Sequence, residues 1–267
     1  MTANKFGDVS VAIQAHVATV EIHRPPHNYF DDRLVRDLAD AFEALDRDSE
    51  CRALLLASEG RSFCAGANLQ EIAGREDLSA ADIYKHAVRL FACEKPVVAA
   101  IQGAAVGGGL GLALVADFRV VAPEAWFGAN FVKLGIHPGF GLTHTLPRLI
   151  GVQRASLMFY TGRRIGAQEA LAWGLADVLA APPDLHSGVL HSGALRKAAH
   201  DLASEIAACA PLAVRSTRAT LRRGLAEAVH AQTDHELAEQ TRLFQTQDHK
   251  EGVLSVRERR QGRFTGS

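Results

Sequence analysis

The chain has 267 residues, 48% of them hydrophobic and 22% charged, which is the composition of a globular rather than a disordered protein. Its 29 Lys and Arg nearly balance its 30 Asp and Glu, so no basic excess points to a nucleic-acid partner. The four cysteines have no paired metal-ligand spacing and are too few for a disulfide framework. Because the first residues also lack an apolar leader, we expect a reducing, cytoplasmic setting and no metal centre.

One uncharged stretch, residues 97–116, is long enough to raise the question of a membrane span. It consists mostly of Ala and Gly, contains Gln102, and has three consecutive glycines from Gly107 to Gly109. This composition favours a buried strand, a glycine-rich turn and a buried helix. A single span without a basic flank would also lack an orienting signal, so we expect no membrane association.

Strands and helices alternate along the first part of the chain. Runs of β-branched residues predict strands at Val9–Ile13 and Val17–His23, joined by a turn at residues 14–16. Asp31 is the expected N-cap of a helix whose apolar positions recur at helical spacing up to Leu45. Further strands are expected at residues 52–58, 97–101 and 118–122. This alternation predicts an α/β core with largely parallel strands.

From about Leu195 onward the strand signal disappears. The pattern predicts four helices, at residues 195–208, 211–223, 225–244 and 250–260. Pro182, Pro183 and the Gly-, Ser- and His-containing segment to Gly193 mark the expected boundary. We therefore expect a core over residues 1–194 and a helical C-terminal region over residues 195–267.

Most standard catalytic signatures are absent from the sequence. There is no P-loop and no Gly-x-Ser-x-Gly elbow, and the glycine run at 107–111 does not complete a dinucleotide-binding fingerprint. His235–Glu236 is not followed by the second His of a zinc-protease helix.

Two glycine-rich junctions remain, at residues 62–69 and 103–109. Each follows a predicted strand and leads toward a helix, where backbone N–H groups suit an anion or a developing oxyanion. Taken alone, such glycines more often only permit tight turns and close packing.

The blocks around these junctions resemble the enoyl-CoA hydratase/isomerase (crotonase) superfamily. They are FCAGANL at 63–69, KPVVAAIQGAAVGGGL at 95–110, ADFRVVA at 116–122, FGANFVKLGIHPGFG at 127–141, LPRLIG at 146–151 and TGRRIGAQEALAWGLAD at 161–177. The stretches LFQTQDHKEGV at 243–253 and RRQGRF at 259–264 look like the family's C-terminal signature. The resemblance covers nearly the whole chain, from His23 to Phe264.

The resemblance implies a core of repeated ββα units, a helical trimerisation region giving a homotrimer or hexamer, and an acyl-CoA thioester as ligand. Coenzyme A would enter only as part of the substrate, with no covalently bound cofactor. The thioester carbonyl would lie between the N–H groups of Ala67 and Gly108. Main-chain contacts to the coenzyme would come from Ala65, Gly66, Ala67 and Leu69. Arg259, beside Arg260, either reaches a coenzyme phosphate or is only a solvated helix charge.

The chain departs from the family at the two glutamates that its hydratases use to activate water. Gly111 and Phe131 occupy these positions, and neither can transfer a proton. Efficient hydration is therefore not expected, and both residues would widen and dry the acyl pocket. Asp117 looks like the family's acid at a strand start, and we expect it to be structural.

Two histidines follow the second lost glutamate. His137 is the candidate general base, because imidazole is the commonest one, and His144 is a weaker candidate. A structural role for either residue remains open.

Three functional classes remain from the sequence. The first is an acyl-CoA enzyme whose isomerase, hydrolase or decarboxylase reaction replaces hydration, and the second is a catalytically degenerate acyl-CoA binder. The third class is an RNA-binding role. The balanced charge and the small number of aromatic residues, three Tyr and two Trp, argue against it. An apolar seam in the C-terminal helices predicts an oligomer, since it needs a partner surface. Its residues are Leu225, Val229, Leu237, Leu243 and Phe244.

Overall fold

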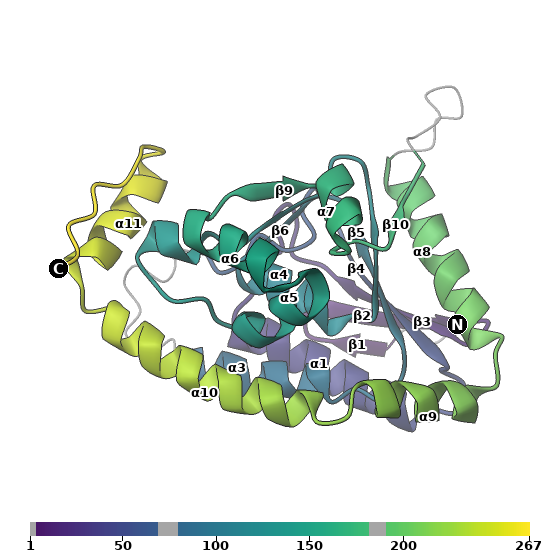
Figure 1. Cartoon of the computed structure of the whole chain (residues 1–267). Coiled ribbons are helices and arrows are strands. Elements are labelled where there is room, and N and C mark those ends of the chain that lie inside the picture. Colours follow the sequence, from purple (N-terminus) through teal and green to yellow (C-terminus); the bar gives the residue numbers. More distant parts are fainter. Residues whose placement is uncertain (1–3, 69–79, 182–190) are drawn as a thin grey trace.

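A computed structural model describes residues 4–68, 80–181 and 191–267 (Figure 1). Within this part of the chain, seven strands form one sheet in the order β1-β2-β3-β4-β5-β7-β10. They are β1 (Asn4–Phe6), β2 (Val9–Gln14), β3 (Val17–Ile22), β4 (Ala53–Ser58), β5 (Val97–Ile101), β7 (Phe118–Val121) and β10 (Val178–Leu179). The first three strands are antiparallel, and every later neighbour pair is parallel. The predicted α/β core with largely parallel strands is confirmed.

The local signals at the N-terminal end of the sheet also hold. Ala15 and His16 both have positive φ, 47° and 66°, in the turn that joins β2 to β3. Two consecutive residues of this kind match the right-handed twist of a tight hairpin. Asp31 accepts a hydrogen bond from the Leu34 N–H at 2.8 Å, which confirms it as the N-cap of α1 (Asp32–Arg47).

Three short strands form a second sheet that the sequence did not reveal. β6 (Ala104–Val106) pairs in parallel with β8 (Trp126–Gly128), which pairs antiparallel with β9 (Arg164–Gly166). β6 lies inside the segment that the glycine pattern predicts as a turn. Three-residue strands are too short to show a periodic pattern, which is why they were missed.

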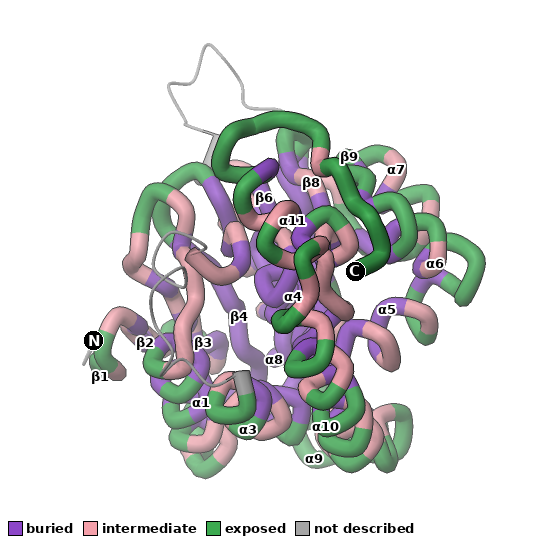
Figure 2. Tube along the Cα trace, turned by 90° about the vertical axis from the view of Figure 1, so that its left-hand side faces the viewer, coloured by how far each residue is buried: buried purple, intermediate pink, exposed green. Residues whose placement is uncertain are grey.

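Helices pack on both faces of the large sheet, and its central strand β4 is buried along its whole length (Figure 2). Along β4, Leu54 and Leu56 join one buried cluster, while Leu55 and Ala57 join the other. α1 and α3 (Ala80–Phe91) pack on the first side, and α8 (His191–Ala207) packs on the second. The strand-free part of the chain therefore begins with a helix that forms one wall of the sheet's own core.

The remaining helices come from the segments after β6 and after α8. They are α4 (Gly108–Val115), the 3-10 helix η1 (Asn130–Leu134), α5 (Leu142–Ile150), α6 (Val152–Thr161), α7 (Ala167–Trp173), α9 (Pro211–Leu221), α10 (Leu225–Leu243) and α11 (Gln247–Arg257). The four expected C-terminal helices are present with ends shifted by a few residues. None of the helices in the described ranges is both long and apolar enough to cross a membrane.

Two C-terminal features bear on the sequence expectations. Val229 of α10 is fully buried, and Leu225 and Leu237 pack against the chain's own core, so the expectation that the whole seam needs a partner surface is wrong. Phe244 is 38% exposed. Asp117 accepts hydrogen bonds from Val97 N–H at 2.8 Å and from two arginines of the α9 segment, so it ties that segment to the sheet.

Candidate active site

The structure brings the two glycine-rich junctions together. Cys64 and Ala105 form a parallel bridge, in which the Cys64 N–H donates to Ala104 O and the Val106 N–H donates to Cys64 O, both at 3.0 Å. The segment after β4 therefore runs beside β6, which leads directly into α4. Backbone pairing, rather than side-chain contact, sets the geometry of this site.

Gly66 and Ala67 lie at the end of this paired segment. Gly66 has φ +85°, and a Cβ there would come within 2.8 Å of Val106 O, so both backbone conformation and space require glycine. The Phe30 N–H donates to Gly66 O at 3.0 Å, and Phe30 forms a parallel bridge with Ala67. Ala67 is thus held by the segment that precedes α1.

Glycines also begin α4. Gly107, with φ +55°, is the N-cap, and its N–H donates to Gly128 O of β8 at 2.8 Å. A Cβ on Gly109 would collide with Cys64 O, so this glycine permits the close approach of the two junctions. The first N–H groups of a helix, here from Gly108 onward, have no partner within the helix. They form a positive end suited to an oxyanion.

Three phenylalanine rings cover the first turn of α4. A Cβ on Gly108 would collide with Phe30 Cζ and Cε1, so the Phe30 ring lies directly over this residue. Phe131 Cζ is 3.7 Å from the Cβ position of Gly107. Phe140 lies against Gly111, and its ring meets the Phe30 ring edge to face, with centroids 5.9 Å apart. The helix terminus therefore has an aromatic surrounding.

The groups that could perform chemistry in this surrounding are few. Gly111 and Phe131 supply no acid. Cys64, within the first junction, is fully buried, and burial raises the pKa of its thiol to about 12. A neutral, packed thiol is a poor nucleophile, so Cys64 is not a catalytic candidate.

Phe140 is held in an unusual conformation by a buried polar network. Its φ is +65°, and Gly141 follows with φ +71°. Glu236 of α10, fully buried, accepts hydrogen bonds from Gly141 N–H at 2.7 Å and from Thr143 N–H at 3.0 Å. Burial raises the pKa of the Glu236 carboxyl, against the hydrogen bonds from Thr143 and Gly141 that lower it. The carboxyl caps the otherwise uncapped start of α5.

Of the two candidate histidines, His137 lies in the same loop. Its Nδ1–H donates to Pro138 O at 2.7 Å, and its ring meets that of His235 on α10 with centroids 5.9 Å apart. These contacts hold the ring toward α10. His144 is half-buried on α5, and burial followed by the charge of Arg148 lowers its pKa. A neutral His144 keeps Nε2 buried without a hydrogen-bond partner.

The remaining candidates concern the coenzyme. Ala65 donates its N–H to His27 O at 3.0 Å, within the first junction. Leu69 lies outside the described residues. Arg259 follows α11 with an exposed side chain, while the neighbouring Arg260 forms ion pairs with Glu251 and Glu258. α11 packs on η1, the element that carries Phe131.

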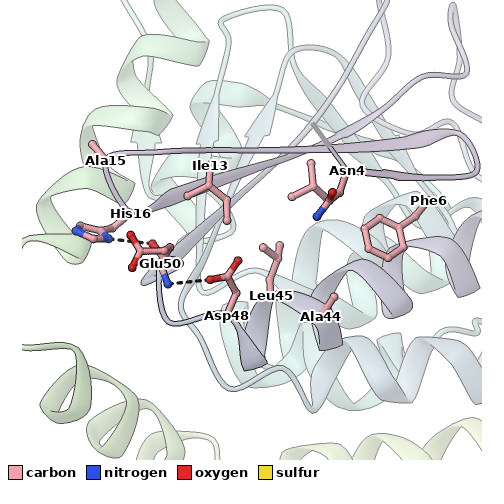
Figure 3. Close-up of a pocket in the computed structure, with 10 residues that line it drawn as sticks. Asn4, Phe6, Ile13, Ala15, His16, Ala44, Leu45, Asp48 and Glu50 are labelled. Atoms are coloured by element: carbon pink, nitrogen blue, oxygen red, sulfur yellow. Dashed lines mark hydrogen bonds between the residues drawn. The ribbon is translucent and has the colours of Figure 1, made fainter. Parts of the chain in front are cut away.

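A separate open pocket of about 550 Å³ lies between the β1-β2 hairpin and the end of α1 (Figure 3). Two of its polar side chains already have partners: His16 Nδ1 bonds to Glu50 O at 2.9 Å, and Asp48 accepts from Glu50 N–H at 2.8 Å. It contains none of the junction residues. We therefore place the candidate active site at the start of α4 and not here.

Comparison with known proteins identifies the family. A family model described as enoyl-CoA hydratase/isomerase matches residues 12–267. The Bacillus subtilis protein YngF, which carries the same family description, is 36% identical over 259 residues, covering 94% of this chain and 95% of its own. The crotonyl-CoA hydratase of Syntrophomonas wolfei is 34% identical over 265 residues, covering 97% and 98% of the two chains. A solved structure of an enoyl-CoA hydratase/isomerase from Pseudoalteromonas atlantica superposes with a TM-score of 0.84 at 27% identity, covering 97% and 100%.

The chain therefore belongs to the enoyl-CoA hydratase/isomerase family, and its architecture is the crotonase fold. The family predicted from the sequence blocks is confirmed.

Sequence reasoning missed Phe30, Phe140 and Glu236. Gly139 and Gly141, on either side of Phe140, signal an irregular backbone there. No spacing in the sequence indicates that Phe140 lies against Gly111, or that Glu236, 95 residues from Gly141, caps α5.

Proposed function

We propose that this protein binds an acyl-CoA thioester and stabilises the negative charge that develops on the thioester oxygen, using the N–H groups of Ala67 and Gly108. The observation that carries this proposal is the backbone pairing of the two junctions, with Gly107 capping α4 and Gly66 in a conformation that requires glycine. An oxyanion gains more from such preorganised donors than a neutral carbonyl does. Loss of one donor of this kind typically costs ~3–4 kcal/mol of transition-state stabilisation.

The reaction is one other than efficient hydration. Adding water across a conjugated thioester requires a base and an acid, and Gly111 and Phe131 provide neither. A reaction that forms an enolate with a single base, such as a double-bond shift or an α-proton exchange, fits the site better. His137 is the proposed base. The phenylalanine rings keep the surroundings of the enolate apolar, which strengthens its interaction with the two amides.

We further propose main-chain contacts to the coenzyme from Ala65, Gly66 and Leu69, and a phosphate contact from Arg259. Assembly as a homotrimer or hexamer in the cytoplasm, without nucleic acid, completes the proposal. The exposed apolar residues Leu212 and Leu221 of α9, 78% and 74% exposed, support assembly. Sedimentation at micromolar concentration tests it, and a monomer contradicts it.

Calorimetry with acetyl-, crotonyl- and longer acyl-CoAs tests the ligand. We expect binding of at least one thioester, together with little loss of crotonyl-CoA absorbance in a hydration assay. Absence of binding to every thioester overturns the proposal, and rapid hydration overturns the proposed reaction class.

The degenerate binder is the second candidate, and the same departures at Gly111 and Phe131 favour it. It predicts binding without proton exchange at the acyl group. Deuterium exchange in bound acyl-CoA separates the two candidates.

A further inference from the structure

A Cβ added to Gly111 would come 2.5 Å from Phe140 Cδ1 and 2.8 Å from Phe140 Cβ and Cγ. Separations under about 3 Å are not tolerated between carbon atoms, so something must move. Rotation of the ring would relieve only the contacts with Cδ1. The contact with Cβ remains, because the backbone fixes that atom.

The backbone at Phe140 cannot shift freely either. Glu236 accepts the Gly141 N–H at 2.7 Å, and a Cβ on Gly139 would collide with the Tyr84 hydroxyl. Tyr84, 8% exposed, donates its O–H to Gln240 of α10 at 2.7 Å. Contacts from α3 and α10 therefore hold the loop in place on both sides of Phe140.

Position 111 lies one helical turn after position 108, on the same face of α4. Phe30 covers position 108, Phe140 covers position 111, and the two rings meet edge to face. This face lies beside the Gly108 N–H, which the proposed function assigns to the thioester oxygen. An acid projecting from position 111 would have to enter the volume that Phe140 occupies.

We propose that Phe140 is a specificity-determining residue of this site: by filling the space beside Gly111 it excludes an acid from α4, and so keeps the site closed to the addition of water. The substrate named in this proposal rests on the proposed function. The packing of Phe140 against Gly111 does not depend on it. It implies that three positions, and not only 111 and 131, set the chemistry. Glutamates restored at 111 and 131 alone would not produce a hydratase.

The first test measures packing without any ligand. Gly111→Ala should lower the midpoint of thermal unfolding in the parent, and should lower it much less in a Phe140→Gly background. Phe140→Gly suits this test, because glycine removes the Cβ and accepts the positive φ. Where Phe140→Gly alone does not fold, Phe140→Ala is used, and a smaller relief of the same sign is expected. Gly166→Ala, at an exposed site with nothing within 4 Å of the new Cβ, is the control. Equal drops in both backgrounds overturn the packing argument.

The second test measures hydration of crotonyl-CoA. Gly111→Glu with Phe131→Glu should remain near the parent rate, and adding Phe140→Gly should raise the rate about 10²-fold or more, the contribution typical of a positioned acid or base. Phe140→Gly alone, which supplies no acid, gives the baseline against which the gain of the triple variant is measured. The proposal is overturned if the double variant hydrates as fast as the triple, or if the triple variant binds crotonyl-CoA without any gain. If no variant binds any acyl-CoA, the proposed function fails, while the unfolding experiment still decides the packing.

Discussion

The ring of Phe30 lies directly on Gly108, so any side chain at position 108 would collide with it. Phe30 is also fixed at its backbone, by its bridge to Ala67 and its hydrogen bond to Gly66 O. One residue thus contacts both proposed amide donors. A substitution at Gly108 should therefore displace Ala67 through Phe30, and a substitution at Ala67 should displace Gly108.

Gly108→Ala should therefore lower turnover of the acyl-CoA substrate about 10²-fold, the effect typical of a 1 Å misplacement in an active site. The amide N–H remains in this variant, and the loss arises from displacement of Phe30 and of the Ala67 segment paired with it. Initial rates under saturating substrate provide the measurement. Gly166→Ala, which adds a methyl group in open space, serves as the matched control. Unchanged turnover in Gly108→Ala would contradict the placement of the site.

The buried Glu236 carboxyl should make the stability of the fold depend on pH. Because burial raises its pKa in the folded state, the folded protein holds this proton more tightly than the unfolded chain does. Its contribution to stability is therefore fully present below the unfolded pKa of about 4.5 and is lost as pH rises through the folded value. Glu236→Gln removes this titration but also weakens the cap on α5. Urea unfolding at pH 4, where the folded carboxyl is protonated, should show the variant less stable by about 1 kcal/mol, the typical worth of one hydrogen bond between uncharged groups.

The difference in unfolding free energy between the parent and Glu236→Gln should become smaller as pH is raised from 4 to 8. Glu239→Gln on the same helix is a control of opposite sign: Arg242 lowers the pKa of that carboxyl, so any difference in unfolding free energy there should widen as pH rises. A constant gap across this pH range would show that Glu236 does not titrate as described.

The fold was predictable where a pattern repeats over several residues. β-branched runs marked β2 and β3, an apolar run marked β4, and the Asp31 cap marked α1, since these signals are local. β6 could not be predicted because its three residues lie within a glycine-rich run. Its pairing with β8 depends on tertiary contacts, which a local pattern does not contain.

The candidate site divides in the same way. Its backbone part was visible, because Gly66 and Gly107 adopt positive φ and such positions select glycine. The aromatic part was not visible. Phe30 and Phe140 come from loops distant in sequence, and apolar residues in loops give no signal of what they cover. The aromatic surroundings of α4 could therefore be found only from the structure.

Asp117 should affect the stability of the fold through its ion pairs. It accepts from Arg218 Nε at 2.8 Å and from Arg222 Nη1 at 3.0 Å, and both arginines are largely buried. Asp117→Asn leaves two buried guanidinium groups without their carboxylate, which should cost about 3–5 kcal/mol of unfolding free energy. Glu239→Gln, which breaks the exposed pair with Arg242, should cost well under 1 kcal/mol. Denaturant titration compares the two variants, and similar losses would contradict the structural role of Asp117.

Arg259 and Arg260 form a matched pair for testing the phosphate contact. The Arg260 guanidinium is paired with Glu251 at 2.5 Å and with Glu258 at 2.6 Å, whereas the Arg259 side chain is exposed. Arg259→Ala should weaken acyl-CoA binding about tenfold, equivalent to 1.4 kcal/mol, since it removes a charge-assisted contact. It should leave binding of the corresponding acyl-pantetheine, which has no phosphates, unchanged. If Arg260→Ala weakened acyl-CoA binding equally, the effect would come from the loss of positive charge and not from a contact specific to Arg259.

His137 is the residue on which the proposed reaction depends. Proton removal from the α carbon of an acyl-CoA gives an enolate, whose charge the amides of Ala67 and Gly108 would hold, so a second acid is not required. Deuterium uptake by a 3-enoyl-CoA in heavy water, followed by mass spectrometry, reports this step without assuming the physiological substrate.

We expect uptake by the parent, and a rate about 10²-fold lower in His137→Gln, the contribution typical of general-base transfer. His144→Gln, on α5, should exchange at the parent rate. Exchange by His137→Gln at the parent rate would make His137 structural, and a specific loss in His144→Gln would move the base to α5. A parent that binds the thioester without any exchange would leave the degenerate binder as the function of this fold.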